Sequence, residues 1–146
     1  MANIVYDSFF TNLMEGDIDL DTDNIYCAII KDTYTPSAAH TAWSDVSGNE
    51  AATTPVALEG YIVGGGALTK SVSTNKFDAT DITFTITATN TLAGAYAVIY
   101  KNAAGAAPVA GDLLICCLDL GGTKTVVAGD FTVQFHSNGI LTFAQA

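Results

Sequence analysis

Regular alternation of apolar and polar residues predicts β-strands in the second half of the chain. In residues 82–87 three apolar residues alternate with three threonines, which places the apolar side chains on one face of a strand. Residues 131–136 repeat this pattern, and an Asn-Gly pair at 138–139 then predicts a tight turn into a strand over residues 140–143. These last two segments are therefore expected to pair as a hairpin.

Unbroken apolar runs predict further strands. Residues 24–31 are apolar on both faces, which is typical of a central strand buried on both sides. Residues 95–101 and 113–120 are apolar runs of strand length, separated by a loop rich in Ala, Gly and Pro (102–111). Together with shorter segments around the glycines at 64–66, the chain holds seven or eight short strands. This pattern predicts a mainly-β fold, either a β-sandwich or a closed barrel.

One short helix is predicted, at the start of the chain. Apolar residues between Asp7 and Gly16 keep roughly helical spacing, with Asp7 as the expected N-cap and Gly16 as the stop. Residues 32–59 show little periodicity, and aromatic contacts are expected to order them. The predicted order within one domain of residues 1–146 is a helical segment (1–16), a first strand (24–31), a long loop (32–59) and the remaining strands (60–146).

Composition and charge exclude several classes of partner. The 146 residues are 49% hydrophobic, and 15 acidic residues outnumber five lysines, with no arginine, for a net charge of -10. Such a chain has no basic surface for nucleic acid or for an anionic membrane. It also lacks an apolar stretch of membrane-spanning length and a basic N-terminal signal region. We therefore expect neither nucleic acid nor a membrane as a partner.

The three cysteines are interpreted as buried thiols. Cys27, Cys116 and Cys117 all lie in apolar runs. Cys116 and Cys117 are adjacent, so on a strand they point to opposite faces and are poorly placed to chelate a metal or to form an ordinary disulfide. We expect all three to be reduced, in a reducing compartment.

Four aspartates at alternate positions, residues 17, 19, 21 and 23, raise the possibility of a calcium loop. However, Asn24 stands where an EF-hand requires Gly, and Ile30 where it requires a bidentate Glu. The preferred interpretation is a solvated turn whose charges discourage unwanted strand pairing, with weak divalent binding as the alternative.

Other motifs give no catalytic or cofactor site. The glycines at 64–66 are followed by Thr69 and Lys70 in a segment that is predicted as strand, so they indicate a bulge or a close backbone approach rather than a phosphate loop. His40 and His136 are too few for a zinc site. His40 is expected to pack on Trp43 or to bond Asp45.

A triad of Ser44, His40 and Asp45 can be drawn on paper, but it lacks a nucleophile elbow. We predict no catalytic residues, no cofactor and no metal site, and hence no enzymatic activity.

Large apolar side chains outside the predicted strands are the candidates for partner binding. A chain with so few charges exposes uncharged surface, as subunits of large assemblies do. The N-terminal segment can serve either as a docking element or as a cover for the end of the sandwich. The candidate residues are Phe9, Phe10, Met14, Tyr34 and Trp43.

The chain resembles, in order and over nearly its whole length, a family of small virion structural proteins of tailed bacteriophages. The resembling segments are Asp7-Ser-Phe-Phe-Thr-Asn-Leu13, Gly16-Asp-Ile-Asp-Leu-Asp-Thr-Asp-Asn-Ile25, Tyr34-Thr-Pro36, His40 with Ser44-Asp-Val46, Gly60-Tyr-Ile-Val-Gly-Gly65, Phe77-Asp-Ala-Thr-Asp-Ile82, Ala97-Val-Ile-Tyr-Lys101, Leu114-Ile115, Asp119-Leu-Gly121 and Gly139-Ile-Leu-Thr142. The resemblance implies a non-enzymatic capsid decoration (cement) protein, with no catalytic residues to transfer.

From this resemblance follow the expected partners and location. They are the major capsid protein and further copies of the same chain, as a homotrimer by analogy with the local three-fold sites of capsid lattices. The expected location is the capsid surface of the virion, and the host cytoplasm during assembly. The alternatives are a tail or head-fibre structural protein, or a ligand- or carbohydrate-binding β-sandwich, with calcium at the aspartates.

Overall fold

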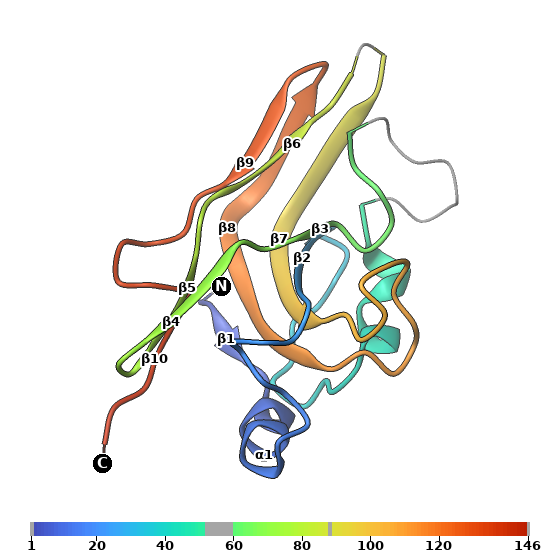
Figure 1. The fold of residues 1–146 in the computed structure, drawn as a ribbon. Coiled ribbons are helices and arrows are strands. Elements are labelled where there is room, and N and C mark those ends of the chain that lie inside the picture. Colours follow the sequence, from blue (N-terminus) through green and yellow to red (C-terminus); the bar gives the residue numbers. More distant parts are fainter. Residues whose placement is uncertain (1, 52–59, 88, 146) are drawn as a thin grey trace.

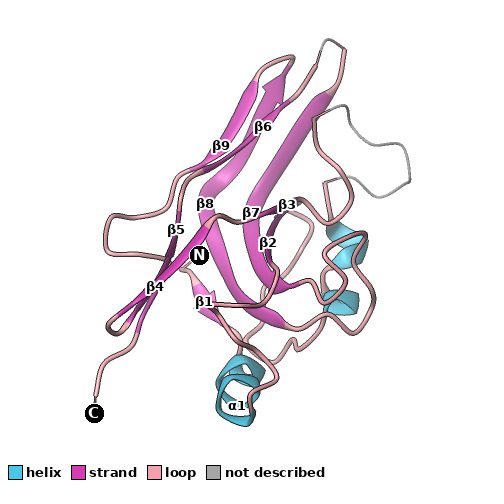
Figure 2. Ribbon diagram, in the orientation of Figure 1, coloured by secondary structure: helices cyan, strands magenta, loops and turns pink. Residues whose placement is uncertain are grey.

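The computed structural model describes residues 2–51, 60–87 and 89–145, and it is mainly β with one α-helix (Figures 1 and 2). The mainly-β class is therefore confirmed. The elements are β1 (Ile4–Val5), α1 (Asp7–Glu15), β2 (Ile25–Ile30), the 3-10 helices η1 (Trp43–Asp45) and η2 (Ser47–Asn49), β3 (Gly66–Ala67), β4 (Lys70–Ser73), β5 (Lys76–Ala79), β6 (Ile82–Thr85), β7 (Thr91–Lys101), β8 (Leu114–Val127), β9 (Asp130–Val133) and β10 (Leu141–Thr142).

The main sheet has five antiparallel strands in the order β1-β8-β7-β2-β3. Its centre is the long β7–β8 hairpin, which extends well beyond β2 (Figure 2). The register shifts twice along this hairpin, once between Gly94 and Tyr96 and once between Ile99 and Tyr100. Such irregularities bend and twist a strand pair.

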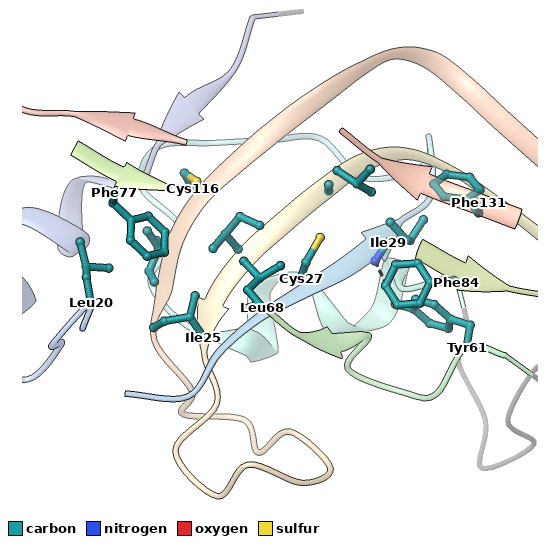
Figure 3. Packing of buried hydrophobic residues seen from close by; sticks show 14 of the residues in the cluster. Leu20, Ile25, Cys27, Ile29, Tyr61, Leu68, Phe77, Phe84, Cys116 and Phe131 are labelled. Carbon is teal, nitrogen blue, oxygen red and sulfur yellow. Dashed lines mark hydrogen bonds between the residues drawn. The ribbon is translucent and has the colours of Figure 1, made fainter. Parts of the chain in front are cut away.

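A second layer covers one face of the main sheet. It consists of the two-stranded sheet β6-β9 and the three-stranded sheet β10-β5-β4. Phe77, Phe84 and Phe131 of this layer belong to the same buried cluster as Ile25 and Ile29 of β2 (Figure 3). The two layers thus form a sandwich, and the alternation in β6 and β9 places their apolar residues inside, as predicted.

The opposite face of the main sheet is covered by the loop after β2. Trp43 stacks on Tyr100 of β7 with ring centroids 4.6 Å apart, and Tyr34 and Val46 join the same buried cluster. The central strands are therefore buried on both faces, which is why β2, β7 and β8 read as continuous apolar runs. The expected aromatic ordering of this loop is confirmed as far as residue 51; residues 52–59 lie outside the described residues.

Several predicted boundaries need correction at the N-terminus. The strand predicted over residues 24–31 forms as β2, but β1 (Ile4–Val5) precedes it as the first strand, and the helix spans Asp7–Glu15 rather than 1–16. The N-cap is Tyr6, so Asp7 lies in the first turn instead, while Gly16 ends the helix in the left-handed conformation as expected. A two-residue strand is too short to show any periodicity. None of the described helices is long and apolar enough to span a membrane.

The predicted C-terminal hairpin is wrong. The tight turn forms, since the Gly139 N–H donates to the His136 carbonyl at 2.7 Å. The strands on either side of it do not pair with each other, because β9 pairs with β6 and β10 pairs with β5. Leu141 lies opposite Phe77, and this long-range apolar pairing directs the chain into the other small sheet.

Candidate partner-binding surface

The five predicted partner-binding residues divide into a buried group and an exposed group. Phe9, Tyr34 and Trp43 are 0%, 3% and 4% exposed, whereas Phe10 is 47% and Met14 is 80% exposed. Phe9 lies in the core between the two layers, and Tyr34 and Trp43 cover the main sheet. These three side chains are therefore not available at the surface of the folded chain, which corrects their assignment as contact residues.

Phe10 and Met14 form what we call the α1 surface. They are four residues apart on α1, so their side chains lie one above the other on the same helix face. The helix lies at one extremity of the molecule, below the main sheet in Figure 1, and its other face buries Phe9. The α1 surface is thus apolar and open to solvent.

An apolar groove begins next to the α1 surface. Its volume is about 470 Å³, and its walls come from the end of α1, the aspartate turn, β4 and the residue after β10. Val72 in this groove is 47% exposed although it is aliphatic. We call it the α1 groove; its lining residues are Leu13, Gly16, Ile18, Asp19, Leu20, Asp21, Val72 and Phe143.

The α1 groove was not predicted from the sequence. The sequence does contain one signal for this site, since Ile18 and Leu20 alternate with the aspartates. In the structure these two side chains are 2% and 7% exposed. This alternation places apolar side chains inward and carboxylates outward, as on a strand with one buried face. Val72 and Phe143 are far away in sequence, and no local pattern connects them to this site.

The aspartates form a hydrogen-bonded turn. Asp19 Oδ1 accepts from the backbone N–H groups of Asp21 at 2.9 Å and Thr22 at 3.2 Å. These bonds hold the pKa of Asp19 below its usual value. Asp23 forms an ion pair of 2.9 Å with Lys101, whose ammonium also donates to the Asp17 carbonyl at 2.7 Å.

This arrangement does not gather the carboxylates around one point. Within residues 2–51, 60–87 and 89–145, no group of three or more His, Cys, Asp or Glu side chains is placed to hold a metal ion. The geometry agrees with the solvated-turn interpretation, since Asp19 and Asp23 bind backbone groups and a lysine.

Glu50, the residue after η2, carries a buried carboxyl group. It is 1% exposed, and its Oε1 accepts from the Tyr61 hydroxyl at 2.8 Å and from the Gly64 N–H at 2.5 Å. The Tyr61 hydroxyl in turn accepts from the Ile29 N–H at 2.9 Å, the bond drawn in Figure 3. Burial raises the pKa of Glu50 to about 7. These bonds fasten the segment around residue 64 to β2.

The glycines at 64–66 make the close backbone approach that was predicted. A Cβ atom at Gly65 would lie 1.9 Å from the carbonyl oxygen of Cys27, and Gly65 has a φ of +76°. Only glycine fits both the space and the left-handed backbone there.

His40 makes a different contact from the two that were expected. Its Nδ1 is hydrogen-bonded to the Tyr34 hydroxyl at 2.7 Å, and Tyr34 lies 3.2 Å from the Tyr6 hydroxyl. Asp45 accepts instead from the backbone N–H groups of Thr41 and Ala42. His40 and Asp45 therefore help to order the loop. The hydrogen bond between His40 and Tyr34 takes the place of the expected packing on Trp43 or bond to Asp45.

The cysteines are buried free thiols, as predicted. Cys116 belongs to the cluster between the two layers and Cys117 to the cluster on the opposite face, so the adjacent pair does point to opposite faces of the main sheet. Burial raises the pKa of Cys27 and of Cys117 to about 12 and also raises that of Cys116. Slow reaction with thiol reagents stays a prediction.

Comparisons with protein-family models, curated proteins and solved structures gave no match to this chain. Of the five predicted contact residues, Phe10 and Met14 are the exposed ones, and the α1 groove begins next to them.

Proposed function

We propose that this chain is a non-enzymatic virion structural protein that binds the outside of an assembled phage capsid as a decoration protein. The α1 surface is the observation that carries the proposal, because Phe10 and Met14 remain exposed in the folded chain. The resemblance of nearly the whole sequence to small phage virion proteins gives the kind of assembly. The proposed partner is the major capsid protein.

The binding free energy from such a contact is small for one copy, but it adds up over all the copies on a shell. Fully burying a side chain such as Phe or Met contributes about 1.5–3 kcal/mol. A ligand that binds only the assembled state stabilises that state by mass action, and this effect is repeated at every binding site. The proposal includes a homotrimer, since a trimer joins several such contacts and gains from their effective concentration.

The net charge of -10 also supports a position outside the shell. An acidic subunit is repelled by DNA and does not compete with the capsid for the packaged genome. During assembly the same chain would be free in the host cytoplasm.

The test uses purified particles that lack this protein. The wild-type chain is added separately to DNA-filled heads and to isolated tails, and each mixture is sedimented. We expect the chain to sediment with heads at saturable occupancy and to raise the temperature at which heads release DNA. Sedimentation with tails alone would overturn the decoration role in favour of a tail or head-fibre role.

A ligand-binding role is the second candidate, and one observation favours it. A cavity of about 320 Å³ lies between β8 and β9, lined in part by Leu120, Lys124 and Phe131. Its size is within the usual range of small-molecule sites. A clear rise in melting temperature with calcium or with soluble glycans, in the absence of any head binding, would favour this candidate.

A further inference from the structure

The α1 groove combines an apolar floor with a charged rim. Leu13, Ile18, Val72 and Phe143 supply the apolar lining, and Ile18 is almost fully buried beneath it. Asp19 and Asp21 of the adjacent turn also line this space, and both are exposed; we call these two residues the rim. An occupant must therefore satisfy both an apolar surface and negative charge.

The negative charge of this rim is only partly balanced within the chain. The ammonium group of Lys101 forms its ion pair with Asp23 and not with the carboxylates of Asp19 or Asp21. Lys70 lies close enough to Asp19 to contribute a small attraction, which adds to the backbone hydrogen bonds that lower the pKa of Asp19. Asp21 and Glu15, beside Met14, add two further exposed carboxylates. Because its pKa is lowered, Asp19 is ionised at neutral pH. Acidic side chains therefore outnumber basic ones around the groove.

We propose that the α1 groove binds a segment of a partner protein in which apolar side chains are flanked by lysine or arginine. The apolar side chains would enter the groove, and the basic groups would meet Asp19 and Asp21. The volume of about 470 Å³ is within the range of sites that bury small ligands or a few side chains. This proposal rests on the proposed function, because it names the chemistry that the capsid partner presents next to the α1 surface.

A second copy of the same chain fits the α1 groove poorly. Each copy carries a net charge of -10 and its few cations are lysines spread along the sequence. Juxtaposing like charges opposes association, whereas complementary charge accelerates it and selects the partner. The charge thus favours a different protein with a basic segment over self-association at this site.

The first experiment measures peptide binding by isothermal titration or by fluorescence anisotropy. The probes are a short synthetic peptide of leucine, isoleucine and lysine, and a matched peptide with glutamate in place of lysine. We expect saturable binding of the basic peptide alone, with an affinity that falls as salt is raised. Equal binding of both peptides, or of neither, would overturn the proposal.

Variants then locate the binding. The double variant Asp19→Asn with Asp21→Asn removes two negative charges. The amide introduced at position 19 keeps an oxygen that can accept the backbone hydrogen bonds. We expect the affinity for the basic peptide to weaken about two- to fivefold for each charge removed. Val72→Ser removes part of the apolar wall and should also weaken binding. Asp130→Asn, a charge removal in β9 that keeps an acceptor for Thr85, is the matched control and should bind as the wild type does.

Melting temperatures check that each variant is folded, and Asp21→Asn alone serves if the double variant is not. Unchanged affinity in the folded groove variants would overturn the proposal. Two further results would also overturn it: binding to anionic phosphatidylglycerol vesicles in place of the peptide, and concentration-dependent dimerisation that is lost in Val72→Ser.

The outcomes for the groove and for the proposed function are distinguishable. If the basic peptide binds in the α1 groove but the wild-type chain does not sediment with heads, the decoration role fails and the groove stands. If the chain coats heads and the groove variants coat them equally well, the groove proposal fails and the decoration role stands.

Discussion

Two regions carry large apolar side chains outside the long strands, and they use these side chains in opposite ways. In the loop after β2, Trp43 is 4% exposed and lies against Tyr100, where it closes one face of the main sheet. On α1, Phe9 is fully buried, whereas Met14 is 80% exposed. The loop completes the fold, and the outer side of α1 is left for another molecule.

The difference follows from what each region has to cover. Within the described residues, Tyr34, Trp43 and Val46 of the loop, together with Tyr6, cover the second face of β2, β7 and β8, so the aromatic side chains of the loop are needed there. The helix lies at the end of the sandwich, and only one of its sides reaches the core. Substitutions in the loop should therefore affect stability, and substitutions on the α1 surface should affect binding.

Trp43→Ala is expected to have the largest effect on stability. Truncating a buried Trp costs about 3–5 kcal/mol, a large share of the roughly 5–15 kcal/mol that stabilises a domain. Urea unfolding followed by circular dichroism measures the loss. A change below about 1 kcal/mol would show that the loop does not seal the sheet and would remove the contrast with α1.

Glu50→Gln should change how stability depends on pH. The pKa of Glu50 is about 7 when folded and 4.5 in the reference state, so the folded chain holds the proton more tightly. This contribution to stability is present below the lower pKa and is lost as pH rises through the higher one, by about 3 kcal/mol in all.

Glutamine does not titrate and keeps an oxygen for Tyr61 and Gly64. The wild-type chain should therefore lose stability relative to Glu50→Gln between about pH 5 and about pH 8. Urea unfolding of both proteins across this range measures the difference. A difference that stays constant with pH would contradict the raised pKa and the burial that causes it.

Tyr34→Phe should have a smaller effect. It removes the hydroxyl that joins Tyr6 to His40 but keeps the ring against Tyr96. The loss of such a hydrogen bond costs about 0.5–1.5 kcal/mol. Chemical unfolding measures this cost, and Tyr96→Phe serves as a ring-matched control. A cost equal to that of Trp43→Ala would mean that polar bonds rather than ring packing hold the loop.

Much of the fold was predictable because its signals are local. Alternation in residues 82–87 and 131–136 fixes which side chains of β6 and β9 face inward, and unbroken apolar runs mark the strands that are covered on both sides. Strand partners were not predictable. The turn at Gly139 has the local signature of a hairpin, but the pairing of Leu141 with Phe77 depends on residues far away in sequence.

The candidate site was predictable only in part. Phe9 and Phe10 are neighbours and equally apolar, and the helix turns by about 100° between them. Which of the two faces solvent depends on where the sheet lies, and the sequence does not contain that information in any local pattern. The same is true of Val72 and Phe143, which join Leu13 and Ile18 in the α1 groove only after the sheets have formed.

The most direct test of the central claim compares head occupancy for the double variant Phe10→Ser with Met14→Ser and for the control Val127→Ser. Val127 is 63% exposed and is the last residue of β8, and Figure 1 shows that this end of the β7–β8 pair lies far from α1. Met14 and Val127 are mostly exposed, so each of these two substitutions should change stability by less than about 0.5 kcal/mol. Phe10 is half-buried beside Phe9, so Phe10→Ser should cost about 1 kcal/mol, which leaves the domain folded. The account predicts that the double variant remains folded and loses most of its occupancy on heads, while Val127→Ser coats them as the wild type does. Wild-type occupancy of the folded double variant would contradict it.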